Sequence, residues 1–362
     1  MLCTRRDIGK LAVAAGAASR LWAAKPNSVF GGVQIGAITY SFRALPSSAD
    51  EVLKYCLDCG ISAIELMSNV AESYVGAPAQ GGRGGFPGGG PGRGPGGGPG
   101  RGPDGAPGAP GQGRGRGGGR GNMTPEQQAA MQKAQQEMKE WRLSVSMDKY
   151  KAFRKLYNDA GVSIYAFKLP PTMNMSDQEY DYIWNVGETL GANHITMELP
   201  AQVNQGELVW NDELLQRVAA FAARRKFRIA FHAHGQGGEK GFQKALDASS
   251  YTALNLDVGH FYGVNGVDPT PVMVKYHDRI ASLHLKDRKG PNSAGESKGP
   301  GGGGPNMPWG QGETPLKEIL QTMKNNRYKF PASIEYEYDT PEGSDVITEV
   351  KKCVQYCKDA LA

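Results

Sequence analysis

Two neighbouring segments, Ala253-Leu-Asn-Leu-Asp-Val-Gly-His260 and Ile280-Ala-Ser-Leu-His-Leu-Lys-Asp-Arg288, decide the fold of this 362-residue chain. Each is a short apolar run that ends in charged or imidazole side chains. This pattern is typical of a buried parallel strand whose carboxyl end opens to solvent. A stretch long enough for a helix separates the two segments. Such runs occur eight times, at Val33–Phe42, Ile61–Met67, Val162–Leu169, His194–Leu199, Arg228–His234, Ala253–Asp257, Ile280–Leu285 and Ala332–Tyr338.

Helix start and stop signals lie between these runs. Eight β-then-α units predict a closed (β/α)8 barrel, that is, a TIM barrel. The alternative, an open doubly wound sheet, usually has a glycine-rich phosphate turn after its first strand, and none follows Val33–Phe42. The signals are capping boxes at Ser48/Glu51 and Ser176/Glu179, a proline at the first helical position in Thr124-Pro125 and Thr314-Pro315, and C-cap glycines at Gly60, Gly161 and Gly191.

The first 24 residues differ from the rest of the chain. Thr4-Arg5-Arg6-Asp7-Ile8-Gly9-Lys10 precedes an apolar, alanine-rich run and a small-residue cleavage site. This order is similar to that of a twin-arginine signal peptide and predicts a periplasmic or otherwise exported protein. The alternative is a short amphipathic helix on the bottom of the barrel. The apolar run is too short to span a bilayer, and no later run reaches that length.

Two glycine-rich stretches interrupt the barrel domain, which we expect over residues 25–362. Residues 76–122 hold 24 of the 51 glycines, and their six arginines and one aspartate account for +5, the formal net charge of the whole chain. We expect this insertion to be disordered, because it cannot bury enough apolar surface to offset its chain entropy. An RNA-binding role is the less favoured alternative. The second stretch, residues 290–305, follows the seventh strand, so both insertions lie on the rim where active-site loops gather.

Ionisable side chains end six of the eight predicted strands. Charged groups in apolar strands cost several kcal/mol unless they are paired or bind a metal. Mixed carboxylate and imidazole donors suit Mn²⁺, Co²⁺, Zn²⁺ or Mg²⁺ and predict a metal site. The alternative interpretation is that these side chains form salt bridges with one another and fill the barrel mouth. These side chains are Glu65, Glu198, His232, His234, Asp257, His260, His284, Lys286, Arg288, Glu335 and Glu337.

The same motifs resemble the xylose-isomerase-like barrel family, often called the sugar phosphate isomerase/epimerase family. The resemblance covers about Val33 to Ala362 without the two insertions. It implies a divalent metal, with Mn²⁺ favoured, bound by a Glu, Asp, His, Glu set from strands 5 to 8. The matching segments are Phe231-His-Ala-His234, Leu256-Asp-Val-Gly-His260, Leu283-His-Leu-Lys-Asp287, Trp309-Gly-Gln-Gly-Glu-Thr-Pro-Leu316 and Ile334-Glu-Tyr-Glu337.

Three of the implied metal ligands carry over, as Asp257, His284 and Glu335, with Glu337, which faces the same side of its strand, as the alternative to Glu335. Strand 5 has histidines where the family has its first glutamate. We therefore expect Glu198, one strand earlier, to be the fourth metal ligand, with His232 or His234 as the alternative. The expected catalytic residues are Glu198, Glu335, His232 and His260, and the expected substrate contacts are Glu65, His234, Lys286, Arg288, Trp309 and Glu337.

The resemblance implies an isomerase or epimerase that acts on a sugar or keto-sugar through an enediolate. Because the His-x-His version of strand 5 resembles inosose-dehydratase-like relatives, a metal-dependent lyase or dehydratase of keto-sugars or keto-glycosides is the second hypothesis. A non-catalytic carbohydrate-binding protein is a distant third. A DNA-cutting enzyme like the family's zinc endonucleases would need more histidines, so we expect a small-molecule partner and no nucleic acid. The sequence leaves the sugar, its phosphorylation and the oligomeric state open.

Overall fold

Eight parallel strands close into a barrel in the computed structural model, which describes residues 25–78, 124–293 and 302–362. The ring is closed because β2 pairs with both β3 and β13. The predicted (β/α)8 fold is therefore confirmed. In ring order the strands are β2 (Val33–Ile38), β13 (Ala332–Ile334), β10 (Ile280–Leu285), β9 (Thr252–Asp257), β8 (Arg228–His232), β5 (His194–Glu198), β4 (Ser163–Lys168) and β3 (Ala63–Met67).

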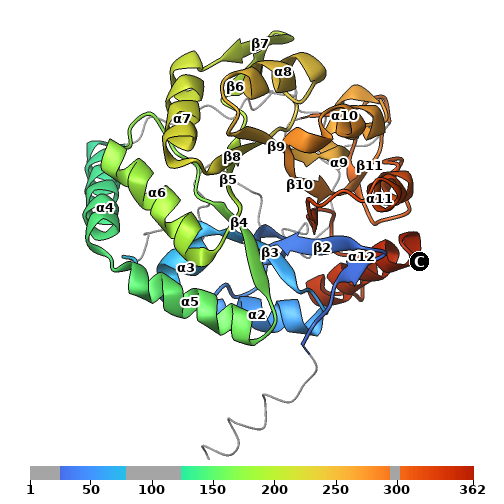
Figure 1. Ribbon diagram of the computed structural model, residues 1–362, viewed down its shortest axis with the longest axis horizontal. Coiled ribbons are helices and arrows are strands. Elements are labelled where there is room, and N and C mark those ends of the chain that lie inside the picture. The colour runs from blue at the N-terminus through green and yellow to red at the C-terminus, as the bar shows by residue number, and fades with distance from the viewer. Residues whose placement is uncertain (1–24, 79–123, 294–301) are drawn as a thin grey trace, which may run out of the picture.

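Helices surround the strands, and the C-terminal helix lies beside the first strands of the barrel (Figure 1). Apolar side chains between the strands and this outer layer form one continuous core. The helices are α2 (Ala49–Asp58), α3 (Ser68–Tyr74), α4 (Pro125–Ser144), α5 (Met147–Asp159), α6 (Asp177–Leu190), α7 (Asp212–Arg225), α8 (Glu239–Asp247), α9 (Val258–Asn265), α10 (Thr270–Lys275), α11 (Leu316–Asn325) and α12 (Val346–Ala360).

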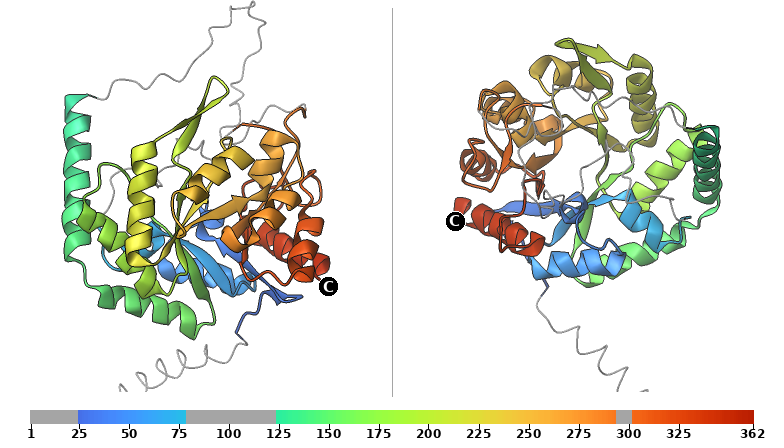
Figure 2. Two further views of the ribbon diagram at one scale, coloured as in Figure 1. Left: turned by 45° about the horizontal axis from the view of Figure 1, so that its top comes forward. Right: turned by 180° about the vertical axis from the view of Figure 1, so that it is seen from behind.

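Two small antiparallel pairs of strands lie at the carboxyl end of the barrel. The hairpin of β6 (Ala201–Asn204) and β7 (Glu207–Trp210) follows β5 and projects from that end (left view of Figure 2). The second pair joins β11 (Asp287–Arg288) to β12 (Asn306–Met307). This pair ties the end of the second glycine-rich stretch to the chain that leaves β10.

Most predicted helix signals are confirmed. The capping boxes of Ser48 and Ser176 are present, Thr124 forms a third with Gln127, and the glycines expected to end helices have positive φ. Thr314 does not cap α11: its hydroxyl accepts the backbone N–H of Arg288, so the helix begins at Leu316.

Two predicted strands, the first and the last, end four residues earlier than expected. The run Val33–Phe42 leaves the barrel after Ile38 and continues as the 3-10 helix η2 (Thr39–Phe42). There the hydroxyl of Ser41 donates to the carbonyl of Ile334 and accepts the N–H of Tyr336. A side chain thus replaces the strand ladder, and β13 ends at Ile334 rather than Tyr338.

The predicted signal peptide and the interior of the first insertion lie outside the described residues, so the expectations for residues 1–24 and 79–122 stay predictions. The chain resumes at α4, which a buried ion pair anchors. Arg142 donates to both carboxylate oxygens of Glu72 on α3, at 2.8 and 3.1 Å, and Tyr182 donates to the same carboxylate at 3.0 Å. Within the described ranges no helix combines the length and apolar character needed to cross a membrane.

Candidate active site

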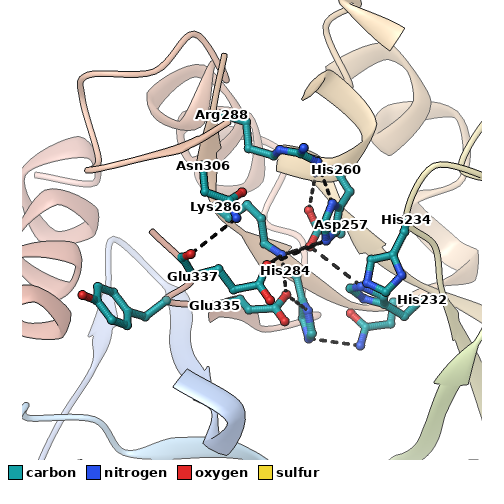
Figure 3. Close-up of polar contacts among 12 residues, drawn as sticks. His232, His234, Asp257, His260, His284, Lys286, Arg288, Asn306, Glu335 and Glu337 are labelled. Carbon is teal, nitrogen blue, oxygen red and sulfur yellow. Dashed lines mark hydrogen bonds and ion pairs between the residues drawn. The ribbon is translucent and has the colours of Figure 1, made fainter. Parts of the chain in front are cut away.

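Four donor side chains converge at the carboxyl end of the barrel. His232, Asp257, His284 and Glu335 each offer one ligand atom, and these atoms all lie within 4.8 Å of one another. They come from β8, β9, β10 and the end of β13, which are consecutive in the ring, and all four are buried. Figure 3 shows them turned toward one another. Three of the four predicted metal ligands are therefore brought together.

Glu198 lies outside this group. It is the register partner of His232 and so has the same height, but it sits one strand further round the ring. Its carboxylate accepts a hydrogen bond from Lys168 at 2.9 Å and lies 3.5 Å from Nδ1 of His234. The geometry thus favours the alternative of the sequence analysis, His232, as the fourth ligand, because its ligand atom lies within 4.8 Å of the other three and Glu198 is not part of this group.

Two carboxylates hold the imidazole of His284. Its Nδ1 lies 2.8 Å from Glu335, and its Nε2 lies 2.8 Å from Glu65. Burial alone would lower the pKa of His284, but these carboxylates raise it to about 10. Burial alone would raise the pKa of Glu65, but His284 lowers it to about 2. Thr196 and Asn255 also donate to Glu65, so the carboxylate that faces Nε2 of His284 is held in place.

The ammonium of Lys286 lies among the carboxylates of the site. Its Nζ is 2.5 Å from Glu337, 3.0 Å from Glu335 and 3.2 Å from Asp257. Burial opposes the charged form, but the three carboxylates outweigh it and raise the pKa of Lys286. Burial raises the pKa of Asp257, whereas Lys286 and His284 lower that of Glu335 despite its burial.

His260 is held between two cations. Arg288 approaches its Nδ1 at 2.7 Å, and Lys286 approaches its Nε2 at 2.8 Å. Both neighbours are donors, and a neutral imidazole has only one acceptor nitrogen, so only one of these two contacts can be a hydrogen bond to the ring. His232, His234 and His260 also lie within ligand distance of one another. Cations approach both ring nitrogens of His260, whereas carboxylates face the ring nitrogens of His284, so the first group is the better metal site.

Some predicted substrate contacts have other partners. Arg288 is fully buried, and it donates to the carbonyls of Gly302 and Gly304 as well as to His260. Glu65 is also fully buried, below His284. Trp309 packs edge-on against Tyr356 of α12, with ring centroids 5.7 Å apart. These three residues therefore support the site from the side away from its mouth. The guanidinium of Arg288, for example, donates its hydrogen bonds to loop carbonyls.

His234 and Glu337 keep the positions expected of substrate contacts. The side chain of His234 is 31% exposed, and Glu337 points into the mouth beside Lys286. Lys286 itself is directed at carboxylates, as described above. Polar groups at the mouth, above a buried donor set, are suited to orient a small polar ligand.

The sequence analysis missed Lys168 and Tyr40. Lys168 ends β4, where a charged residue in the apolar run Phe167-Lys-Leu169 was the available signal. Burial and the carboxylates of Glu337 and Glu335 raise the pKa of Tyr40, which places its phenol near the mouth. Tyr40 follows the strand that ended early, so no pattern in the sequence marked it.

The four donors fit a divalent metal. Oδ2 of Asp257 is buried and makes no hydrogen bond, although the ammonium of Lys286 lies 3.2 Å away, and such an oxygen is costly unless another group binds it. Nε2 of His232 lies 4.0 Å from this oxygen. Two imidazoles and two carboxylates form a borderline donor set of the kind that Mn²⁺, Co²⁺ and Zn²⁺ accept. Glu65 supplies the outer hydrogen bond that orients a metal-binding histidine.

Comparison with known proteins agrees with this fold. Residues 129–357 match the family described as xylose isomerase-like TIM barrel. The chain belongs to this family. None of the curated proteins compared with it matches.

Several solved structures share the barrel. A probable 3-DHS dehydratase from Bacillus anthracis is 14% identical, with a TM-score of 0.53, over 89% of this chain and 98% of that one. A 3-keto-D-glucoside 4-epimerase from E. coli is 9% identical, with a TM-score of 0.53, over 90% and 99%. A sugar phosphate isomerase/epimerase from Parabacteroides distasonis is 15% identical, with a TM-score of 0.50, over 90% and 93%. At such identities the likeness concerns the fold alone.

Proposed function

We propose that this protein is a divalent-metal-dependent isomerase or epimerase that acts on a sugar or keto-sugar through an enediolate. The observation that carries the proposal is the convergence of His232, Asp257, His284 and Glu335 at the barrel mouth. These four residues would hold the ion. When bound there, a divalent ion polarises a carbonyl and stabilises the negative charge that develops on its oxygen. Family membership supports an enzyme that modifies sugars.

Two carboxylates are placed to move protons on opposite sides of the substrate. Glu335 extends from β13 and Glu198 ends β5, and three strands separate β13 from β5 in either direction round the ring. Epimerisation requires one group to remove a proton from one face and another to deliver a proton to the opposite face. Glu198 keeps a buried oxygen, Oε2, without a hydrogen-bond partner, while Lys168 holds its other oxygen at 2.9 Å.

The remaining polar groups would orient the sugar and assist proton transfer. Nε2 of His260 lies 3.8 and 4.0 Å from oxygens of Asp257 and Glu337, so a substrate oxygen that enters between them would come within reach of this ring. His234 lies beside Glu198 at the open side of the mouth. Both histidines would thus bind hydroxyl or carbonyl oxygens.

A lyase or dehydratase of keto-sugars is the second candidate. It would use the same proton removal, followed by loss of a β-hydroxyl to which His260 or Lys286 donates a proton. The ammonium of Lys286 favours this candidate because its positive charge would stabilise the oxygen of a leaving hydroxyl. One solved relative is described as a probable dehydratase and another as an epimerase, so the fold is compatible with both reactions.

Proton NMR in D₂O separates these activities. Metal-free protein is loaded with Mn²⁺, Mg²⁺, Co²⁺ or Zn²⁺ and mixed with free aldoses, ketoses and 3-keto sugars. Because Mn²⁺, the favoured ion, broadens signals, it is removed before spectra are recorded. Deuterium in a product of unchanged composition indicates isomerisation or epimerisation, whereas loss of water indicates elimination.

Glu198→Gln provides the matched variant, because Glu198 lies outside the four-residue donor group. We expect this variant to bind the ion normally and to exchange deuterium slowly. A wild-type protein that binds sugars but never exchanges or eliminates would instead be a carbohydrate-binding protein. Failure to bind any of the four ions would refute the proposed function.

We also propose that residues 1–24 direct export through the twin-arginine pathway. The paired Arg5 and Arg6 and the following apolar run support this proposal. The expected mature protein begins near Lys25 and is found in the periplasmic fraction. Replacing both arginines by lysine should retain the precursor in the cytoplasm; an uncleaved wild-type chain there would refute the proposal.

A further inference from the structure

Lys286 holds a position that conflicts with a bound divalent ion. Its ammonium lies 3.0 Å from Glu335 and 3.2 Å from Asp257, and both carboxylates belong to the four-residue donor group. The side chain is only 2% exposed. An ammonium and a divalent cation would therefore share the same two carboxylates in a region from which water is largely excluded.

The direction of the lysine side chain is tightly constrained. A Cβ on Gly259 would lie 2.3 Å from Cγ of Lys286 and 2.4 Å from its carbonyl oxygen, so only glycine leaves room for this side chain. The shortest contact of the ammonium is with Glu337, at 2.5 Å, and Glu337 is outside the donor group. The site thus has one carboxylate that can keep the ammonium when the other two bind an ion.

We propose that Lys286 is a built-in competitor of the metal ion. In the metal-free protein its ammonium neutralises Asp257 and Glu335. When an ion binds, the ammonium gives up these two contacts and keeps its contact with Glu337. Lys286 thereby weakens the affinity for the metal, and Glu337 limits that weakening. The inference rests on the metal site of the proposed function, but it concerns binding and is independent of the reaction.

The size of the effect follows from the charges. Repulsion between an ammonium and a divalent ion a few ångströms apart is only partly screened in a buried site. Removing the ammonium should therefore lower the Kd for the metal by at least about tenfold. Removing its alternative partner should raise that Kd, because the ammonium then stays with the ligand carboxylates.

Isothermal titration of the EDTA-stripped full chain with Mn²⁺ alone tests the proposal. We expect Lys286→Met to bind Mn²⁺ at least about tenfold more tightly than wild type. Lys168→Met is the matched control: it also removes an ammonium paired with a glutamate, but at the opposite side of the ring. This control should change the Kd much less than Lys286→Met, because Lys168 pairs with Glu198 outside the donor group.

A second variant and a second measurement guard against misfolding. Glu337→Gln should weaken Mn²⁺ binding, a change opposite in sign to that of Lys286→Met. Without an ion, Lys286→Met leaves three buried carboxylates without their ammonium partner, so its melting temperature should fall and then rise more on adding Mn²⁺ than that of wild type.

Three possible outcomes of the Mn²⁺ titrations decide whether Lys286 competes with the metal. Tighter binding by Lys286→Met with little change in Lys168→Met supports the competition. Unchanged or weaker binding by Lys286→Met, or equal tightening by both lysine variants, overturns it while leaving the metal site intact. If the wild-type chain binds no Mn²⁺, the proposed metal site itself is wrong, and the inference falls with it.

Discussion

Glu65→Gln tests whether the carboxylate below His284 prepares that imidazole for a metal. Glu65 is fully buried, and its oxygen lies 2.8 Å from Nε2 of His284. Removing one partner of a buried charge pair costs about 3–5 kcal/mol, because the other charge is left uncompensated. We therefore expect the metal-free variant to lose about 3 kcal/mol of unfolding free energy. Denaturant titration in EDTA measures this loss.

The same substitution should also weaken metal binding. A glutamine amide can donate to Nε2, which moves the imidazole proton to Nδ1, the atom that faces Glu335. A metal would then have to displace that proton, and loss of such an outer hydrogen bond typically costs about 10–100-fold in affinity. Calorimetric titration with Mn²⁺ measures the change in Kd.

Glu72→Gln is the matched control, because Glu72 forms a buried pair with Arg142 away from the barrel mouth. It should cost similar stability and leave the Kd for Mn²⁺ unchanged. The reasoning is refuted if Glu65→Gln binds Mn²⁺ as tightly as wild type, or if both variants lose affinity equally. In either case the contact below His284 would be structural only.

Three further predictions follow from the same geometry. Because the folded-state pKa of Glu65 is lowered to about 2, its stabilisation is present above pH 4.5 and lost as the pH falls toward 2, so metal-free wild type should lose roughly 3 kcal/mol more than Glu65→Gln over that interval in acid denaturation. His232→Ala should lose at least about tenfold in Mn²⁺ affinity and Glu198→Ala less than threefold, as measured by calorimetry, whereas the reverse order would make Glu198 the fourth ligand. Gly259→Ala should cost about 1–3 kcal/mol because its Cβ would meet the Lys286 backbone, while Gly238→Ala, with no neighbour within 4 Å, should be nearly neutral in the same denaturant assay.

Much of the fold could be predicted from local patterns. Apolar runs bounded by capping boxes and C-cap glycines identify buried strands and their helices, because each signal depends on hydrogen bonds within a few residues. The boundaries at Phe42 and Tyr338 could not be predicted. They depend on the hydroxyl of Ser41, which bonds to a segment almost 300 residues away along the chain.

Part of the site was also accessible from the sequence. Asp257, His284 and Glu335 end their strands, and parallel strands in a closed barrel bring their carboxyl ends to one rim. Membership of the xylose isomerase-like family agrees with this expectation. Lys168, which ends β4, was missed, although a lysine in an apolar run is itself a signal.

The amino-acid sequence by itself determined the order of strands and helices, the barrel class and the rim at which ionisable groups gather, because these follow from periodicity and chain order. Only the tertiary structure decided which of those groups form ion pairs with one another. Glu198 and His232 are register partners at one height on neighbouring strands. Their different positions round the ring make Glu198 a partner of Lys168 and His232 a candidate metal ligand. Likewise, Arg288 bonds to loop carbonyls and Lys286 lies among three carboxylates, since electrostatic partners are set by distances across the barrel that no local pattern records.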